Sequence, residues 1–272
     1  PDKRIHCPGY LELGDRVFNC WKKEGHGARD FVDAMRDSCD VYFYQLGIKA
    51  GASLIERYAG AFGIGHVTGI PLAGESKGRS FGPMTRARIL QIAQPSSARG
   101  RRRVGWRQGD TANLSVGQGG LLMTPIQAAV LIAAVANRGL LYRPYVVERI
   151  LTPDGETVME TAPVVERRVE LREGVWDLLQ KSLRRVVDSG TARSAAIPGL
   201  EIAGKTGTAQ NPLGDDHAWF VAYAGRPGQP VRLAVAVLVQ HGGHGGETAV
   251  PVARAVIESY FENEGLPLPV AL

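Results

Sequence analysis

Three strand-like segments follow one another near the end of this chain, with only short links between them. They cover residues 201–210, 217–224 and 231–240, and they are rich in the β-branched, aromatic and small apolar residues typical of strands. The links carry Asn-Pro and Arg-Pro-Gly, which are turn signals. Because parallel neighbours need a crossover of about a dozen residues or more, these segments are expected to form an antiparallel meander. A helix at 250–261 would cover it.

The rest of the chain predicts mainly helices, which favours an α+β fold with an antiparallel sheet covered by helices. Apolar residues make up 44% of the 272 residues and charged residues 22%, as in an ordinary globular protein. Thr124-Pro125 indicates a helix start, with Thr as the cap and Pro in the first turn. The expected helices cover 31–37 after the cap Asp30, 41–46 after Asp40, 52–62, 125–137 and 171–187. Residues 141–160 are expected to form two strands around a turn at Pro153-Asp154-Gly155. Residues 1–30 are expected to be irregular, and residues 64–110 to be loops with short elements.

The strongest chemical signal is Gly204-Lys205-Thr206-Gly207-Thr208, which lies in the first strand of the meander. Lys205 supplies a positive charge and Thr206 a hydroxyl, and together they can bind a carboxylate. Gly207 has no side chain, so a bound peptide backbone can approach the strand edge. An ordinary polar edge strand could carry the same letters, so the segment needs support from elsewhere in the sequence.

Ser38-Cys39-Asp40 stands at the junction of two predicted helices, 167 positions before Lys205. Serine and aspartate at such a junction often do no more than cap a helix. Taken alone, the tripeptide therefore indicates a cap. It indicates a catalytic role only in combination with the strand that carries Lys205-Thr206-Gly207.

The three cysteines and one histidine form a regular series: 12 residues separate Cys7 from Cys20, five separate Cys20 from His26, and 12 separate His26 from Cys39. Three cysteines and one histidine are a complete tetrahedral ligand set for Zn²⁺. The series uses every cysteine of the chain, and its segment has little apolar content to hold itself together. We therefore predict a structural zinc site, which would also fix the backbone on both sides of Cys39. A Cys7–Cys20 disulfide with Cys39 buried, or three separate thiols, remain as alternatives.

The combination of these segments resembles the transpeptidase domain of class B penicillin-binding proteins, closest to the elongation-type group called penicillin-binding protein 2. Lys-Thr-Gly and Ser-x-Asp/Asn are two of the three short motifs of serine penicillin-binding proteins and β-lactamases. The matching stretches occur in family order over nearly the whole chain. They are Pro8-Gly9-Tyr10, Trp21-Lys22-Lys23 with Gly25-His26-Gly27, residues 38–44, 62–65, 68–70, 109–111, 115–119, 124–127, 205–210 and 216–220.

The resemblance implies a two-step acyl transfer on peptidoglycan stem peptides. It implies that Ser38 relays a proton and that Asp40 orients the network around the catalytic lysine. Lys205 and Thr206 would bind the terminal carboxylate of the substrate. The N–H of Thr208 would supply half of the oxyanion hole, a type of interaction worth about 3 kcal/mol.

The third motif of that family, Ser-x-x-Lys, is missing from this sequence. No serine has lysine three positions later; Ser182 has Arg185 at that position, but arginine stays protonated and cannot act as a base. The resemblance implies that the helix with Ser-x-x-Lys lies upstream, so this chain alone is expected neither to transpeptidate nor to be acylated by penicillin. A non-catalytic, zinc-stabilised scaffold of the elongation machinery is the alternative. A β-lactamase or carboxypeptidase would share the fold, but the long match disfavours both.

Residues 1–272 are thus expected to be the C-terminal portion of one transpeptidase domain. Within it, 1–50 would form the zinc-stabilised segment with the Ser-x-Asp motif, and 200–265 the Lys-Thr-Gly sheet with its helix. The resemblance implies an extracytoplasmic location on the periplasmic face of the inner membrane, with the anchor outside this chain. It implies a glycosyltransferase or elongation-complex partner, and β-lactam binding only where the serine segment is present.

Two further features are expected to have no separate chemistry. Much of the net charge of +5 lies in residues 99–107, but no nucleic-acid motif accompanies it, so a solvated loop and no nucleic-acid partner are expected. His241 and His244 lie among glycines and are expected in a flexible loop on the active-site side. His217 and Trp219 are expected to line the site or pack the sheet.

Overall fold

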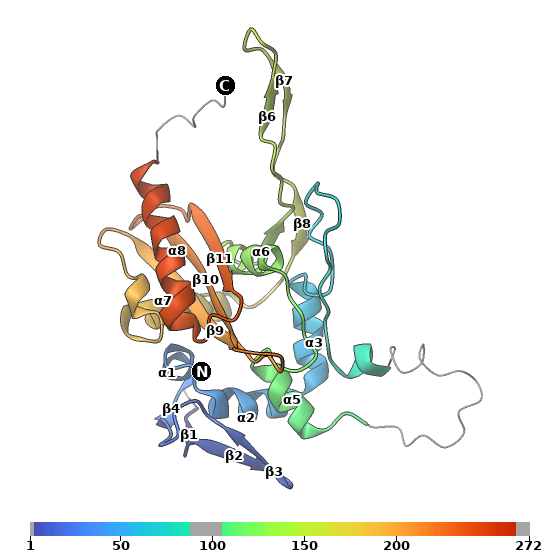
Figure 1. The fold of residues 1–272 in the computed structure, drawn as a ribbon, viewed down its shortest axis with the longest axis vertical. Helices are drawn as coiled ribbons and strands as arrows, with labels where there is room; N and C mark the ends of the chain where they lie inside the picture. The colour runs from blue at the N-terminus through green and yellow to red at the C-terminus, as the bar shows by residue number, and fades with distance from the viewer. Residues whose placement is uncertain (1–2, 88–104, 265–272) are drawn as a thin grey trace, which may run out of the picture.

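The structure is a computed structural model, and it describes residues 3–87 and 105–264. Its centre is an antiparallel sheet in the order β11-β10-β9, formed by β9 (Glu201–Ala209), β10 (His217–Gly225) and β11 (Leu233–Val239). The pairing of β10 with both neighbours is regular along its length. This sheet confirms the meander that the short links predicted (Figure 1).

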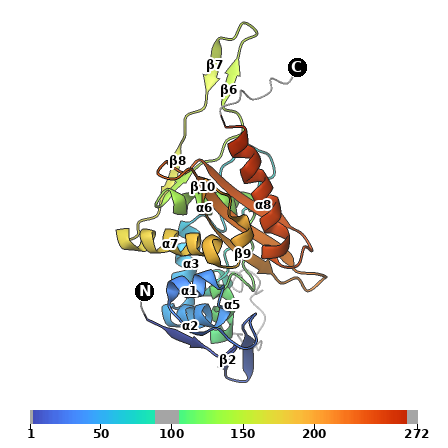
Figure 2. The ribbon, with the colours of Figure 1, turned by 90° about the vertical axis from the view of Figure 1, so that its left-hand side faces the viewer.

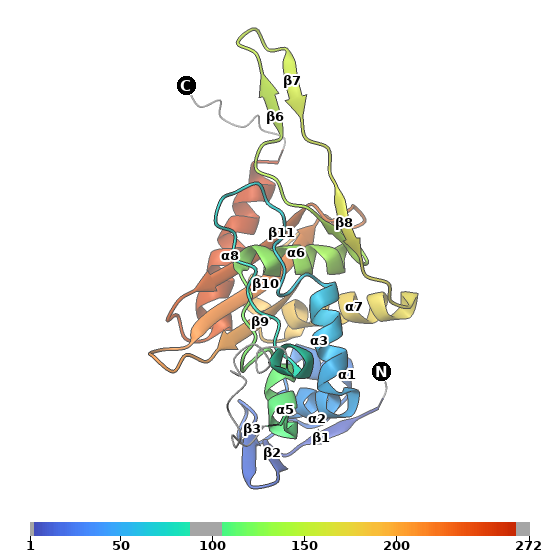
Figure 3. The same ribbon diagram turned by 90° about the vertical axis from the view of Figure 1, so that its right-hand side faces the viewer.

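Helices cover both faces of the sheet, because its strands alternate buried side chains on the two sides. On one face, alanines and Phe220 of β10 pack against α8 (Gly245–Glu262). On the other, Ala203 and Tyr223 pack against α6 (Pro125–Ala136) and the inner face of α7 (Glu173–Ser189). Figures 1 and 3 show α8 and α6 on opposite sides of the sheet. The fold is therefore α+β, as expected.

The helix that covers the sheet begins earlier than the sequence predicted. The prediction started it at Val250 and placed the glycine tract before it in a loop, but α8 begins at Gly245. A side-chain carbon on Gly245 would lie 2.3 Å from the Gly207 carbonyl oxygen and 2.4 Å from that of Trp219. The close approach of the helix start to β9 and β10 therefore requires glycine there, which is a tertiary constraint that local propensity does not report.

We expect Gly245→Ala to destabilise the protein by about 1–3 kcal/mol, because the new methyl group overlaps two backbone carbonyls. Gly174→Ala is a matched control, since Gly174 lies in the first turn of α7 with nothing within 4 Å of the added carbon. That control should be neutral or stabilise by about 0.4–1 kcal/mol. Thermal melting of both variants tests the contrast, and equal melting temperatures would contradict it.

Four short helices form a second layer below the sheet, and two β-ribbons lie beneath them (Figures 1 and 2). The helices are α1 (Phe31–Arg36), α2 (Asp40–Ala50), α3 (Ala52–Ala61) and α5 (Gln108–Ser115). The ribbons pair β1 (Ile5–Cys7) with β4 (Gly27–Arg29), and β2 (Tyr10–Leu13) with β3 (Arg16–Asn19). The prediction that residues 1–30 are irregular was wrong, because strands of three or four residues are too short to show a hydrophobic period. Residues 64–110 were expected to be loops with short elements, and the short helix α5 begins there at Gln108.

A hairpin extends from the upper end of the molecule, away from the sheet (Figures 1 and 2). Its strands β6 (Arg149–Leu151) and β7 (Thr157–Glu160) flank the predicted Pro-Asp-Gly turn, which confirms that part of the prediction. The base of the hairpin is a second pair, β5 (Leu140–Tyr142) with β8 (Val165–Arg168), which the sequence did not indicate. A short 3₁₀ helix, η1 (Arg193–Ala195), follows α7. Within the described residues, no helix is long and apolar enough to cross a membrane.

Candidate functional site

The open edge of β9 carries the Lys-Thr-Gly segment. Thr208 lies opposite Ala218 of β10, but its carbonyl oxygen accepts a hydrogen bond from Gln118 Nε2 at 3.0 Å. That carbonyl therefore points away from the sheet. Because the N–H and C=O of one strand residue point to the same side, the N–H of Thr208 also faces the open edge. The strand thus presents a backbone donor next to the lysine.

Lys205 connects the strand edge to the turn between α1 and α2. Its ammonium donates to Ser38 Oγ at 2.8 Å and to the Thr206 carbonyl oxygen at 2.8 Å. Burial lowers the pKa of Lys205 to about 8, although the Asp40 carboxylate acts in the opposite direction. The structure therefore brings Ser38 and Lys205 together across 167 positions of sequence, and it places a cation and a hydroxyl at one edge.

Asp40 lies close to this pair but is held by a different contact. Its Oδ2 accepts the backbone N–H of Trp21 at 3.0 Å. Burial raises the pKa of the Asp40 carboxyl to about 6, with the Trp21 N–H opposing that shift. No hydrogen bond joins Asp40 to Ser38 or Lys205 among the residues that the structure describes, so its role in orienting the network stays a prediction.

Two polar residues that the sequence analysis gave no role also contact the strand. Thr191, just after α7, shares a hydrogen bond of 2.7 Å between its Oγ1 and that of Thr206. Gln118 holds the Thr208 carbonyl, as described above. Gln118 stands between two glycines, a pattern that could have drawn attention to it. Thr191 has no comparable local signal, because its partner lies on a neighbouring element.

His217 and His241 connect the two turns beside the site. The side chain of His217 accepts the backbone N–H of His241 at 3.0 Å through Nδ1, and the two rings contact edge to face. His241 also lies 3.2 Å from the carbonyl oxygen of Asp215 through its Nδ1. The contacts join the β9–β10 turn to the β11–α8 turn. A side-chain carbon on Gly207 would lie 3.3 Å from Trp219 Cβ, so glycine also allows that close pairing.

The three cysteines and His26 converge at the start of α2, where Cys39 is the N-cap. Their ligand atoms all lie within 4.8 Å of one another, and all four residues are buried. His26 Nδ1 is 3.4 Å from the sulfur of Cys20 and 3.7 Å from that of Cys7. A tetrahedral zinc ion, with bonds of about 2.0–2.3 Å, places neighbouring ligand atoms about 3.5–3.8 Å apart. The donor set and its spacing therefore fit zinc.

The chemistry of these side chains agrees with a ligand set. All three cysteines are free thiols. The hydrogen bond between the Cys39 and Cys20 thiols lowers the pKa of Cys20 and raises that of Cys39. The ring nitrogen of His26 that faces the sulfur atoms is Nδ1, and the other, Nε2, is buried without a hydrogen-bond partner among the described residues. Cys39 stands between Ser38 and Asp40, so the cluster is continuous with the turn that faces Lys205.

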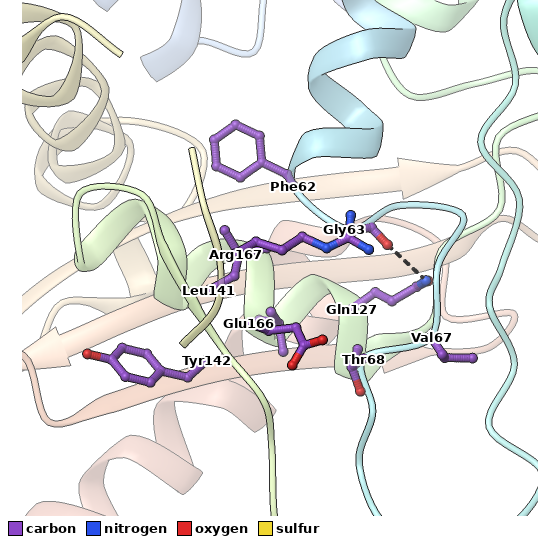
Figure 4. A pocket seen from close by; sticks show the side chains of 10 residues that line it. Phe62, Gly63, Val67, Thr68, Gln127, Leu141, Tyr142, Glu166 and Arg167 are labelled. Carbon is purple, nitrogen blue, oxygen red and sulfur yellow. Dashed lines mark hydrogen bonds between the residues drawn. The ribbon is translucent and has the colours of Figure 1, made fainter. Parts of the chain in front are cut away.

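A small pocket at the base of the hairpin is a separate feature. Figure 4 shows Phe62, Leu141 and Tyr142 around it, with the Gln127 amide reaching the Gly63 carbonyl oxygen at 3.4 Å. Neither Ser38 nor Lys205 lines this pocket. The arginine-rich segment 99–107 lies for the most part outside the described residues. The pocket is therefore distinct from the contact between Ser38 and Lys205 at the edge of β9.

Comparisons with known proteins show which family the chain belongs to. The family model described as the penicillin binding protein transpeptidase domain matches residues 1–258. The peptidoglycan D,D-transpeptidase MrdA of Acinetobacter baumannii is 33% identical over 94% of this chain and 38% of its own length. The crystal structure of Pseudomonas aeruginosa PBP2 in complex with WCK 5153 is 31% identical, with a TM-score of 0.77 over 96% of this chain and 54% of that one. PBP2 of Helicobacter pylori in complex with MreC is 25% identical, with a TM-score of 0.77 over 97% of this chain and 46% of that one.

The chain therefore belongs to the penicillin-binding protein transpeptidase domain family. Within that family it is of class B and of the penicillin-binding protein 2 type. The resemblance stated from the sequence and the expected fold are confirmed. The chain spans less than half the length of the Acinetobacter relative that it matches.

Proposed function

We propose that this chain supplies the substrate-binding edge and the proton-relay turn of a peptidoglycan D,D-transpeptidase. The observation that carries the proposal is the 2.8 Å contact between Lys205 Nζ and Ser38 Oγ, which joins the Lys-Thr-Gly strand to the Ser-x-Asp turn. The names of the relatives support the reaction type. The proposal requires a nucleophilic serine from outside residues 1–272, since no Ser-x-x-Lys occurs in them.

In the proposed reaction, the serine oxygen bonds to the carbonyl carbon of the penultimate D-alanine of a stem peptide. The bond to the terminal D-alanine breaks, and its amine takes a proton through the Ser38 hydroxyl. The amine of a second stem peptide then attacks the ester, and the serine recovers its proton as the cross-link forms. Lys205 and Thr206 hold the substrate carboxylate, and the N–H of Thr208 faces the developing oxyanion.

We also propose that Cys7, Cys20, His26 and Cys39 hold a structural zinc ion. When bound, the ion would cross-link the segment from β1 to the start of α2 through its bonds to the four side chains. That segment has only a small core of its own, in which the cysteines are themselves members. The site has no open coordination position in this donor set, so its part in the protein is to support the Ser38 turn.

The proposed setting is extracytoplasmic, in a complex of the cell-elongation machinery. The structure of Helicobacter pylori PBP2 with MreC supports such an assembly for relatives of this chain. The second candidate function is a non-catalytic, zinc-stabilised scaffold of the same machinery. The absence of Ser-x-x-Lys from the sequence is the observation that favours it.

Fluorescent penicillin distinguishes the two functions. We expect the product of the complete gene to form a stable covalent adduct that excess unlabelled penicillin prevents. Residues 1–272 alone should remain unlabelled, since they lack the nucleophile. If the complete product carries no adduct under conditions that label a known transpeptidase, the catalytic proposal is wrong and the scaffold is favoured.

A further inference from the structure

Ser38 has a backbone conformation that serine seldom adopts. Its φ is 52°, in the left-handed region where glycine is usual. It follows the C-cap Asp37 of α1, and two hydrogen bonds define the end of that helix: Ser38 N–H to the Met35 carbonyl at 3.3 Å and Cys39 N–H to the Ala34 carbonyl at 2.9 Å. These are the two bonds of a Schellman motif, which normally has glycine where Ser38 stands. A serine at this position therefore needs other contacts to hold it.

Trp21 supplies three such contacts from the segment after β3. Its indole Nε1 donates to the carbonyl oxygens of Asp37 and Ser38, each at 3.0 Å. Its backbone N–H donates to Asp40 Oδ2 at 3.0 Å. The last carbonyls of a helix have no partner within the helix, so the indole satisfies the groups that the end of α1 leaves free. The same residue thus holds the turn on both sides of Cys39.

The other side of the turn is held by Gly190 and Thr191, which follow α7; Thr191 is also the residue that contacts Thr206. The backbone N–H of Thr191 donates to the Arg36 carbonyl oxygen at 3.3 Å. Gly190 packs so closely that a side-chain carbon there would lie 2.4 Å from the same oxygen. The carbonyls of Arg36, Asp37 and Ser38 are therefore all occupied, and the backbone that directs the Ser38 side chain toward Lys205 is held on both sides.

We propose that Trp21 is a positioning residue that keeps Ser38 in its left-handed conformation and its hydroxyl within reach of Lys205. The inference rests on the proposed transpeptidase function. Trp21 lies outside the ligand set and outside the three motifs, and the residue is 60% exposed. An exposed tryptophan whose N–H is shared between two carbonyls of the site turn is better explained by positioning than by core packing.

The test is a double-mutant cycle on acylation of the complete gene product by a chromogenic β-lactam. Trp21→Phe removes the indole donor but keeps an aromatic ring beside His26, which Trp21 contacts edge to face. We expect the maximal acylation rate to fall about 10-fold or more, because small displacements of a relay group are costly. The dissociation constant of the non-covalent complex should not change, since Lys205 and Thr206 are untouched.

The second arm uses Ser38→Gly, which removes the hydroxyl and tolerates the left-handed backbone without help. In that background, Trp21→Phe should change the acylation rate by no more than about two-fold, because the hydroxyl that it positions is already absent. Trp106→Phe is the matched control: it removes an indole bond of 2.8 Å to Thr111 Oγ1 and should leave acylation unchanged. A wild-type rate in Trp21→Phe, an equal loss in both backgrounds, or an equal loss in Trp106→Phe overturns the proposal.

The failure of the proposed function would look different from the failure of this inference. If the wild-type protein is not acylated at all, the transpeptidase proposal fails. The conformational claim is then decided by crystal structures of the Trp21→Phe protein and its parent. A changed φ at Ser38 and a Lys205 Nζ–Ser38 Oγ separation longer than the present 2.8 Å support it. Unchanged values overturn it.

Discussion

Replacing Lys205 with methionine is expected to reduce acylation of the complete gene product by penicillin about 10³-fold. Methionine fills a similar volume but removes the ammonium that contacts Ser38 Oγ and the Thr206 carbonyl. The substrate carboxylate would lose its cationic partner, and the Ser38 hydroxyl would lose its hydrogen-bond donor. The measurement is the second-order rate constant of acylation in a stopped-flow or gel assay.

The same substitution should cost little stability, which separates a chemical role from a structural one. Burial disfavours the charged form of Lys205, as the lowering of its pKa shows. An apolar residue of similar size in such a place is often neutral or stabilising. Lys205→Arg is the control that keeps a charge, although its planar group does not reproduce the geometry of the ammonium. Near-normal acylation in Lys205→Met would contradict the assignment of the site.

The pKa of Lys205 also gives this prediction a pH dependence. The lysine must be protonated to bind a carboxylate, and its pKa in the free protein is about 8. Binding of the anionic substrate should therefore be strongest below that pH and weaken as the pH rises above it. In Lys205→Met, substrate binding should not show this decrease as the pH rises above about 8.

Loss of the proposed zinc ion is expected to lower the stability of the folded protein strongly. Cys7→Ser removes one sulfur ligand at a position far in sequence from the Ser38 turn, so it tests the cluster without altering the relay residues. We expect loss of stoichiometric zinc and destabilisation of about 4 kcal/mol or more, because a structural metal contributes directly to folding. Elemental analysis and thermal melting provide the two measurements. A chelator should lower the melting temperature of the wild-type protein in the same way.

Cys7→Asp is the matched variant, because a carboxylate oxygen is also a zinc ligand. It should retain zinc and recover much of the stability that Cys7→Ser loses. Purified wild-type protein without zinc, or a Cys7–Cys20 disulfide found by mass spectrometry, would refute the metal proposal. Intact stability in Cys7→Ser would do the same.

Several features of the fold were predictable because their causes lie within a few residues. The short Asn-Pro and Arg-Pro-Gly links leave only antiparallel pairing to the three strands, and the structure has that order. Thr124 accepts the N–H of Gln127, whose side chain accepts the N–H of Thr124, so the predicted start of α6 has a full capping box. The ribbons of residues 1–30 were not predictable in this way, because strands of three or four residues are too short to show a hydrophobic period.

The sequence by itself determined the sheet order, the caps of α1 and α6, and the identity of the four residues that converge in the cysteine cluster. Tertiary structure alone decided the start of α8 at Gly245 and the contacts of Trp21, Thr191 and Gln118 with the site. The reason is physical: turn, capping and periodicity signals act between close neighbours in the chain. Contacts such as Ser38 with Lys205 depend instead on how whole layers pack, and resemblance to a family anticipated that pair where local rules could not.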